Sequence, residues 1–125
     1  MNINFILYVK DQAKSREFYA RVFNMVPVLD VPGMTEFKLV AGCVLGLMPV
    51  KGAKRLLPGI PDPEKAGGVP RAEVYLTVKD PAAFQARALA AGAVELSPLA
   101  PRDWGHRAAY SLDPDGHVLA FAEPL

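Results

Sequence analysis

The stretch FILYVKD at residues 5–11 returns as VYLTVKD at residues 74–80, 69 positions further along the chain. Both stretches are rich in β-branched and aromatic residues, which is typical of a largely buried strand. Both end in an aspartate, Asp11 or Asp80, a residue type that is preferred immediately before a helix. Each copy therefore predicts a strand that is followed directly by a helix.

The residues after each aspartate support these two helices. After Asp11, apolar residues spaced four apart would line one helical face, in the pairs Phe18 with Val22 and Tyr19 with Phe23. After Asp80, Pro81 stands at the first helical position, where its missing N–H costs nothing. Gly92 suits the left-handed position that ends a helix, so the second helix is predicted to stop there.

Three strand candidates separated by turn residues follow each predicted helix. They cover residues 25–30, 35–40 and 43–50 in the first half and residues 94–96, 107–112 and 117–123 in the second. The last strand also repeats, because GCVLGLMPV at 42–50 matches GHVLAFAEPL at 116–125. The order of strand, helix and three strands thus occurs twice. We expect an α+β fold of two βαβββ modules, at residues 1–50 and 72–125.

The segment between the modules, residues 51–71, contains four prolines and four glycines. Proline removes a backbone N–H donor and disrupts helices and central strands. We therefore interpret this segment as a linker that forms neither a helix nor a central strand.

Composition excludes several classes of protein. The 125 residues include 14 basic and 13 acidic side chains, so the net charge of +1 argues against a nucleic-acid-binding protein. Cys43 is the only cysteine, which excludes an intrachain disulfide and a cysteine zinc cluster. No signal peptide is predicted, and no apolar run approaches the ~20 residues of a membrane span. We expect a soluble cytoplasmic protein.

The duplicated order, the REFY stretch at residues 16–19 and the closing DPDGH at residues 113–117 resemble the vicinal oxygen chelate superfamily. Its members include glyoxalase I, fosfomycin resistance enzymes, extradiol dioxygenases, methylmalonyl-CoA epimerase and the bleomycin resistance proteins. The resemblance implies that the two modules form a curved mixed sheet around a cleft. It also implies a homodimer, because many members build that cleft from two chains.

The same resemblance indicates where metal ligands would stand. They would lie seven residues before each capping aspartate and four residues after each turn glycine, which here means Asn4, Glu73, Gly46 and Ala120. Only Glu73 is a good ligand, while Gly46 and Ala120 have no donor side chain. Since metal sites normally use about three protein ligands, we expect no metal and no other cofactor.

A metal-free cleft is closest to the bleomycin resistance branch, whose members hold a bulky aromatic, often cationic, drug. Trp104 lies in PRDWGHR at residues 101–107, which resembles the Trp-Gly loop of that branch. Its indole offers a flat face for stacking or cation–π contact, although it would equally serve to pack the loop against the sheet. Glu73 is the strongest further candidate, as a carboxylate that holds a ligand amine or moves a proton.

The other candidate ligand contacts are side chains expected to line the same cleft. They are His106, Tyr110, Asn4, Phe37 and Met48. Phe121 alternates with Ala120 along its strand, so it is predicted to belong to the core. His117 follows the turn glycine and is predicted to face solvent.

Three hypotheses follow. The first is a metal-free protein that binds a small molecule in the cleft of a dimer. The second is a metal-dependent lyase, isomerase or dioxygenase of the same superfamily, with an atypical site that uses Glu73 and His106. The third is a structural or regulatory subunit that has lost its ligand site. No membrane or nucleic-acid partner is expected.

Overall fold

A computed structural model describes all residues from Met1 to Leu125, and the chain divides into two units. Unit 1 comprises Met1–Ala20 and Asn24–Gly67, and unit 2 comprises Arg21–Phe23 and Gly68–Leu125. No helix of the chain is long and apolar enough to cross a membrane.

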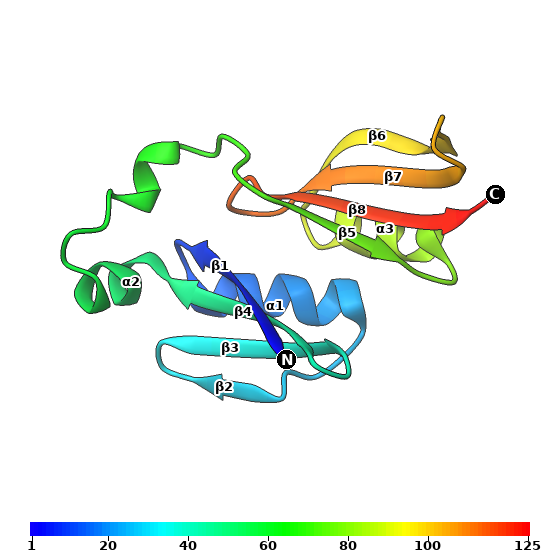
Figure 1. Ribbon diagram of the computed structural model, residues 1–125. Helices are drawn as coiled ribbons and strands as arrows, with labels where there is room; N and C mark the ends of the chain where they lie inside the picture. Colours follow the sequence, from blue (N-terminus) through cyan, green and yellow to red (C-terminus); the bar gives the residue numbers. More distant parts are fainter. The chain divides into compact units, whose positions relative to one another are not determined.

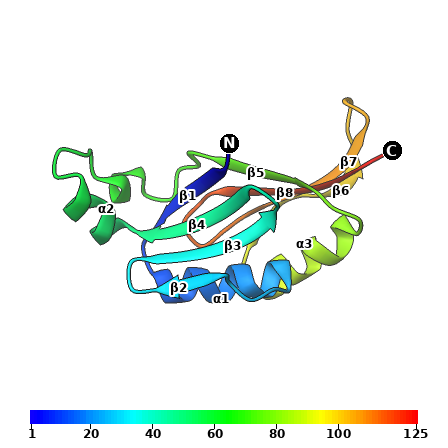
Figure 2. The ribbon, with the colours of Figure 1, turned by 60° about the horizontal axis from the view of Figure 1, so that its bottom comes forward.

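Unit 1 contains the first strand, helix and three strands, which form a mixed sheet with a helix on one face (Figures 1 and 2). Its elements are β1 (Ile3–Val9), α1 (Gln12–Phe23), β2 (Leu29–Val31), β3 (Met34–Val40), β4 (Cys43–Pro49), α2 (Val50–Leu56) and the 3₁₀ helix η1 (Pro63–Ala66). The last three residues of α1, Arg21–Phe23, are counted with unit 2. The strand order is β1-β4-β3-β2. Strand β1 is parallel to β4, and the other pairs are antiparallel.

Unit 2 repeats this arrangement. Its elements are β5 (Glu73–Thr77), α3 (Pro81–Ala90), β6 (Val94–Pro101), β7 (His106–Leu112) and β8 (Val118–Pro124). The strand order is β5-β8-β7-β6, with β5 parallel to β8 and the other pairs antiparallel. The predicted α+β fold of two βαβββ modules is therefore confirmed.

The two aspartates act as predicted at the helix starts. A carboxylate oxygen of Asp11 accepts the backbone N–H of Lys14 at 3.0 Å, and that of Asp80 accepts the N–H of Ala83 at 3.1 Å. Each bond satisfies one of the N–H groups that the first helical turn leaves without a partner. The repeated strand and aspartate thus direct the chain into a helix twice.

Each sheet buries one face against its long helix. In unit 1, Leu7, Phe37 and Leu47 have almost no exposed surface, and Phe18 and Tyr19 of α1 are buried as well. In unit 2, Phe121 is fully buried, and its ring centroid lies 5.4 Å from that of Phe84 on α3. The prediction that Phe121 belongs to the core is confirmed.

The expectation that residues 51–71 form no helix is wrong. Helix α2 occupies Val50–Leu56 and packs against β1 and β4. This stretch contains no proline, because the prolines of the segment begin only at Pro58. Pro49 immediately precedes α2, a position where its missing N–H interrupts no helical hydrogen bond.

Two strands also differ in length from their predictions. Strand β2 is shorter, at Leu29–Val31 instead of residues 25–30. Strand β6 is longer and continues through Pro98 to Pro101, where the sequence predicted only residues 94–96. It can do so because it is an edge strand whose register shifts between Ser97 and Ala100, and a sheet tolerates proline at edges and bulges.

Candidate functional site

The face of the unit 2 sheet that is turned away from α3 carries the candidate side chains, and we call it the distal face. Tyr75 on β5 and Tyr110 on β7 both pair with Ala120 on β8, so these three residues share one row of the sheet. Because side chains alternate along a strand, Glu73 lies on the same face as Tyr75. Phe121 faces the other way, toward α3.

At one end of the distal face, three aromatic side chains form a hydrogen-bonded cluster. The indole Nε1 of Trp104 donates to the hydroxyl of Tyr75 at 2.9 Å. That hydroxyl lies 2.7 Å from Nδ1 of His106, within hydrogen-bond distance. The rings of Tyr75 and His106 are also stacked, with centroids 5.9 Å apart and planes inclined by 25°. We call Tyr75, Trp104 and His106 the aromatic cluster.

The turn between β6 and β7 positions the indole of this cluster. The N–H of Arg102 donates to the carbonyl of His106 at 2.7 Å, which closes the turn. Gly105 adopts a φ of +87°, a left-handed conformation that glycine reaches without steric cost. Trp104 lies between them and keeps 52% of its surface exposed. Its indole N–H is therefore held in place while its ring stays accessible.

Arg102 anchors the same turn to the sheet. Its guanidinium donates to the hydroxyl of Ser97 at 2.8 Å and to the carbonyls of Pro98 at 2.9 Å and Ala108 at 2.8 Å. The guanidinium carbon also lies 5.2 Å from the centroid of the Tyr110 ring, a cation–π contact. With several of its donors used in these bonds, Arg102 acts as a structural support for the turn.

Tyr110 lies beside this arginine and keeps its proton. Burial raises the pKa of its hydroxyl above the ordinary value, and the negative charge of Glu73 raises it further, while Arg102 opposes the shift. Glu73 stands two residues before Tyr75, which shares its row of the sheet with Tyr110, so the carboxylate and the phenol lie on the same face. Glu73 itself is exposed at the start of β5.

The sequence did not single out Tyr75 or Arg102. Tyr75 could have been found from alternation, because it stands two residues after Glu73 and a strand returns to the same face at that spacing. Nothing in the sequence marks Arg102, whose acceptors belong to β6 and β7 and depend on how these strands are paired.

The candidates in unit 1 lie on two different faces of its sheet. The side-chain amide of Asn4 donates to a carboxylate oxygen of Glu36 at 3.2 Å. Met48 is half-buried. Its terminal methyl group lies close to Gly52 of α2, since a Cβ added to that glycine would be 3.8 Å from it. Phe37, in contrast, has no exposed surface and pairs with Leu45 in the core. Its predicted contact with a ligand is corrected to a packing role.

His117 also departs from its prediction. It was expected to face solvent, but only 3% of its surface is exposed. Its backbone N–H donates to a carboxylate oxygen of Asp113 at 2.8 Å, which draws the residue in under the turn that precedes β8.

The residues present do not fit a metal ion. At the four positions that the superfamily uses, Gly46 and Ala120 provide no donor atom, and no group of three His, Cys, Asp or Glu side chains is arranged to hold a metal. A Cβ at residue 46 would already lie 3.1 Å from Ile6 and 3.2 Å from Met34, so neighbouring side chains fill that position.

Glu73 and His106 are also too far apart to share an ion. Glu73 pairs with Val118 of β8, whereas His106 pairs with Pro124 at the other end of the same strand. At about 3.3 Å per residue these positions are separated by about 20 Å. Because metal–ligand bonds are only about 2 Å long, the atypical site suggested by the sequence does not form within this unit.

Known proteins are similar to this chain in sequence or in fold. An uncharacterized protein from Mycobacterium bovis is 31% identical over an alignment of 128 positions, which covers 95% of this chain and 80% of that protein. The structure of a glyoxalase-related enzyme from Fulvimarina pelagi matches with a TM-score of 0.83 and 24% identity, over 98% of this chain and 87% of that one.

A protein of unknown function from Agrobacterium tumefaciens matches with a TM-score of 0.77 and 25% identity, over 100% of this chain and 94% of that one. A family model described as the Glyoxalase/Bleomycin resistance protein/Dioxygenase superfamily matches residues 3–121. Because the chain contains the duplicated βαβββ module and matches this family model over nearly its whole length, it belongs to the glyoxalase/bleomycin resistance protein/dioxygenase superfamily.

Proposed function

We propose that this chain is a metal-free protein that binds a flat aromatic small molecule on the distal face of unit 2. The observation that carries the proposal is the aromatic cluster, in which the Trp104 indole is held by Tyr75 yet remains 52% exposed. A free surface tryptophan loses side-chain entropy when a ligand orders it. An indole that is already oriented avoids part of that cost and offers a large face for stacking.

Glu73 extends the proposal to the charge of the ligand. It lies on the same face as Tyr75 and is exposed. Glu73 stands two residues along β5 from Tyr75, so the amine of a ligand that extends from the aromatic cluster along the sheet would meet its carboxylate. A cation is attracted both by that charge and by the ring faces. We therefore propose a cationic aromatic ligand, bound by a cytoplasmic homodimer.

We propose a metal-free protein because the chain lacks side chains that could bind a metal ion at the positions the superfamily uses. Two of the four superfamily positions are Gly46 and Ala120, and Glu73 and His106 lie at opposite ends of β8. Within this scheme the work of the protein is binding: Trp104 and Tyr75 stack on the ligand, Glu73 neutralises its charge, and Tyr110 stays protonated as a hydroxyl donor.

Fluorescence tests the proposal directly, because Trp104 is the only tryptophan. Titration with a panel of planar amines should change its emission saturably and raise the melting temperature. Glu73→Gln should weaken binding of cationic aromatic compounds while leaving neutral aromatic compounds unaffected. Glu64→Gln removes an exposed carboxylate from unit 1 and is the matched control.

Two outcomes would overturn the proposal. One is stoichiometric, tightly bound nickel, zinc, iron or manganese in the purified protein, which would favour a metal-dependent enzyme. The other is that no compound of the panel changes the Trp104 emission or the melting temperature, which would favour a subunit that has lost its ligand site. Sedimentation equilibrium measures the proposed dimer separately.

A further inference from the structure

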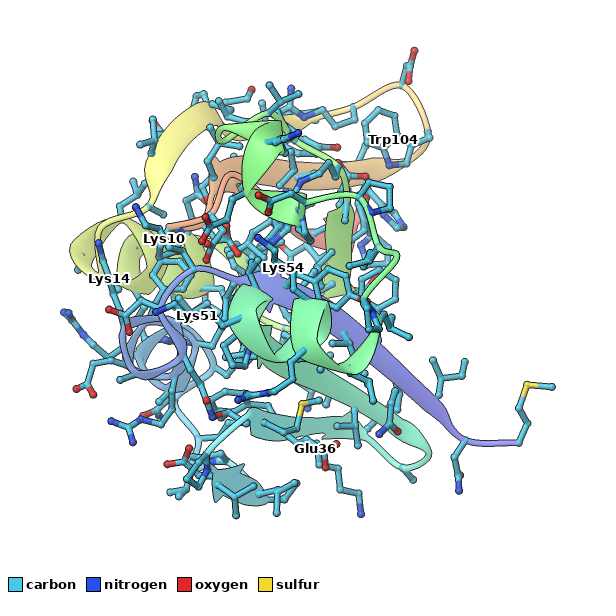
Figure 3. The ribbon with its side chains drawn as sticks, turned by 90° about the vertical axis from the view of Figure 1, so that its left-hand side faces the viewer. Lys10, Lys14, Glu36, Lys51, Lys54 and Trp104 are labelled. Carbon is cyan, nitrogen blue, oxygen red and sulfur yellow. The ribbon has the colours of Figure 1, made fainter.

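The hydrogen atoms of the aromatic cluster follow from the chemistry of its donors and acceptors. Figure 3 shows Trp104 at the turn that joins β6 to β7. Its indole nitrogen can only donate, so the Tyr75 oxygen accepts that hydrogen at 2.9 Å. The hydroxyl of Tyr75 keeps its own hydrogen, and Nδ1 of His106 lies 2.7 Å away. This hydrogen can therefore be donated to the imidazole.

The length of the second contact indicates its direction. N–H donors usually lie about 2.9–3.0 Å from an acceptor oxygen, whereas hydroxyl donors approach to about 2.7–2.8 Å. The 2.7 Å between Tyr75 and His106 is thus typical of a hydroxyl donor. In the opposite direction, the Tyr75 oxygen would accept two hydrogens, and its own hydrogen would have no acceptor in the protein. A chain of bonds in one direction is also cooperative, because each bond polarises the next.

This direction fixes the tautomer of His106. Since Nδ1 accepts a hydrogen, the proton of the neutral imidazole lies on Nε2. Nε2 makes no hydrogen bond within the protein and is not a buried atom. His106 stands four residues before Tyr110 on β7, so alternation places both on the distal face. The aromatic cluster therefore presents one accessible N–H donor beside the Trp104 indole.

We infer that the ligand carries a ring carbonyl whose oxygen accepts the Nε2–H of His106. The inference rests on the proposed function, which places a flat aromatic ring on Trp104. A donor that loses water when a ligand covers it needs a new acceptor, because an unsatisfied N–H costs free energy. A ring carbonyl lies in the plane of its aromatic ring, so a single rigid ligand stacks on the indole and reaches His106. The ligand class is thus an aromatic carbonyl compound that also carries an amine.

NMR of the full chain with labelled histidine nitrogens tests the tautomer at about pH 8, where histidine is mostly neutral. Nε2 of His106 should show the signal of a protonated nitrogen, and Nδ1 that of an unprotonated one. In Tyr75→Phe the two signals should move toward each other, because loss of the hydroxyl donor populates the second tautomer. Tyr8→Phe removes a phenol hydroxyl from unit 1 and should leave both signals unchanged.

Calorimetry with two probe compounds tests the ligand class. Both 4-(aminomethyl)coumarin and 1-(aminomethyl)naphthalene have two fused rings and an ammonium group, but only the coumarin has a ring carbonyl. The coumarin should bind about fivefold more tightly, which is the effect of one neutral hydrogen bond. His106→Phe retains an aromatic ring beside Tyr75 and should abolish this preference without changing the affinity for the naphthalene. Tyr8→Phe should keep the preference.

The possible failures of the two proposals are distinguishable. A proton on Nδ1 of His106 in the original chain, or equal affinity for the two compounds, would overturn this inference and leave the proposed ligand surface intact. An equal loss of affinity for both compounds in His106→Phe would do the same, because the imidazole would then contribute only packing. If neither compound binds to the original chain, the proposed function and this inference are both refuted.

Discussion

Replacement of Tyr75 by phenylalanine should release the indole of Trp104 without disturbing the sheet. The Tyr75 hydroxyl accepts the Trp104 N–H at 2.9 Å and lies 2.7 Å from Nδ1 of His106. Phenylalanine keeps the ring that stacks on His106, with centroids 5.9 Å apart. The substitution therefore removes two hydrogen bonds and very little packing.

The expected loss of stability is small. A hydrogen bond inside a protein contributes about 1 kcal/mol net, because water replaces it when it breaks. Trp104 is 52% exposed, so its freed N–H can bond to water, and His106 is only half-buried. We expect the free energy of unfolding to fall by about 1–2 kcal/mol for the two bonds together, below the roughly 3–5 kcal/mol of truncating a buried aromatic residue.

Fluorescence anisotropy decay of Trp104 is the decisive measurement, since a released indole moves on the nanosecond timescale. The fast component should grow in Tyr75→Phe, and urea unfolding should show the small loss of stability. Tyr110→Phe is the matched control, because the Tyr110 hydroxyl makes no hydrogen bond and its ring contact with Arg102, at 5.2 Å, would remain. Unchanged Trp104 mobility in Tyr75→Phe, or an equal gain in the control, would refute the reasoning.

Three further predictions concern stability. Ser15→Ala should raise the free energy of unfolding by about 1 kcal/mol in urea denaturation, because the serine hydroxyl is buried in α1 without a partner and alanine favours helix. Gly116→Ala should cost about 3 kcal/mol in the same assay, since its φ is +88° and an added Cβ would lie 2.2 Å from the Gly68 carbonyl oxygen. A hydrogen bond from Arg16 lowers the pKa of Asp30, so this carboxylate stabilises the fold at neutral pH and loses that effect as the pH falls through its folded pKa. The free energy of unfolding, measured from pH 6 to pH 3, should therefore decline less steeply in Asp30→Asn than in the original chain.

Much of the fold was predictable because its signals are local. Asp11 caps a helix through the N–H of a residue three positions away, and alternation along a strand assigns Phe121 to the core. Helix α2 was missed because proline content was averaged over residues 51–71, although the prolines begin only at Pro58. The burial of His117 was missed because it depends on a hydrogen bond from the backbone N–H of His117 to the side-chain carboxylate of Asp113.

The candidate site was predictable only in part. Trp104 and His106 are joined through Tyr75, whereas Glu73 stands at the other end of the sheet from His106. Phe37 lies in the core of unit 1. Alternation from Ala120 identified Phe121 as a core residue, but no comparable reference residue placed Phe37. Its own pairing with Leu45 across two strands decided which face it occupies.

The sequence by itself determined the duplicated module, the helix starts and the absence of donor atoms at Gly46 and Ala120, because each follows from residue identity and short spacing. The tertiary structure alone decided that Tyr75 bridges Trp104 and His106, and that Glu73 and His106 stand at opposite ends of a strand. These relations join residues about 30 positions apart. They depend on strand register, and a shift of one residue would turn every side chain to the other face of the sheet.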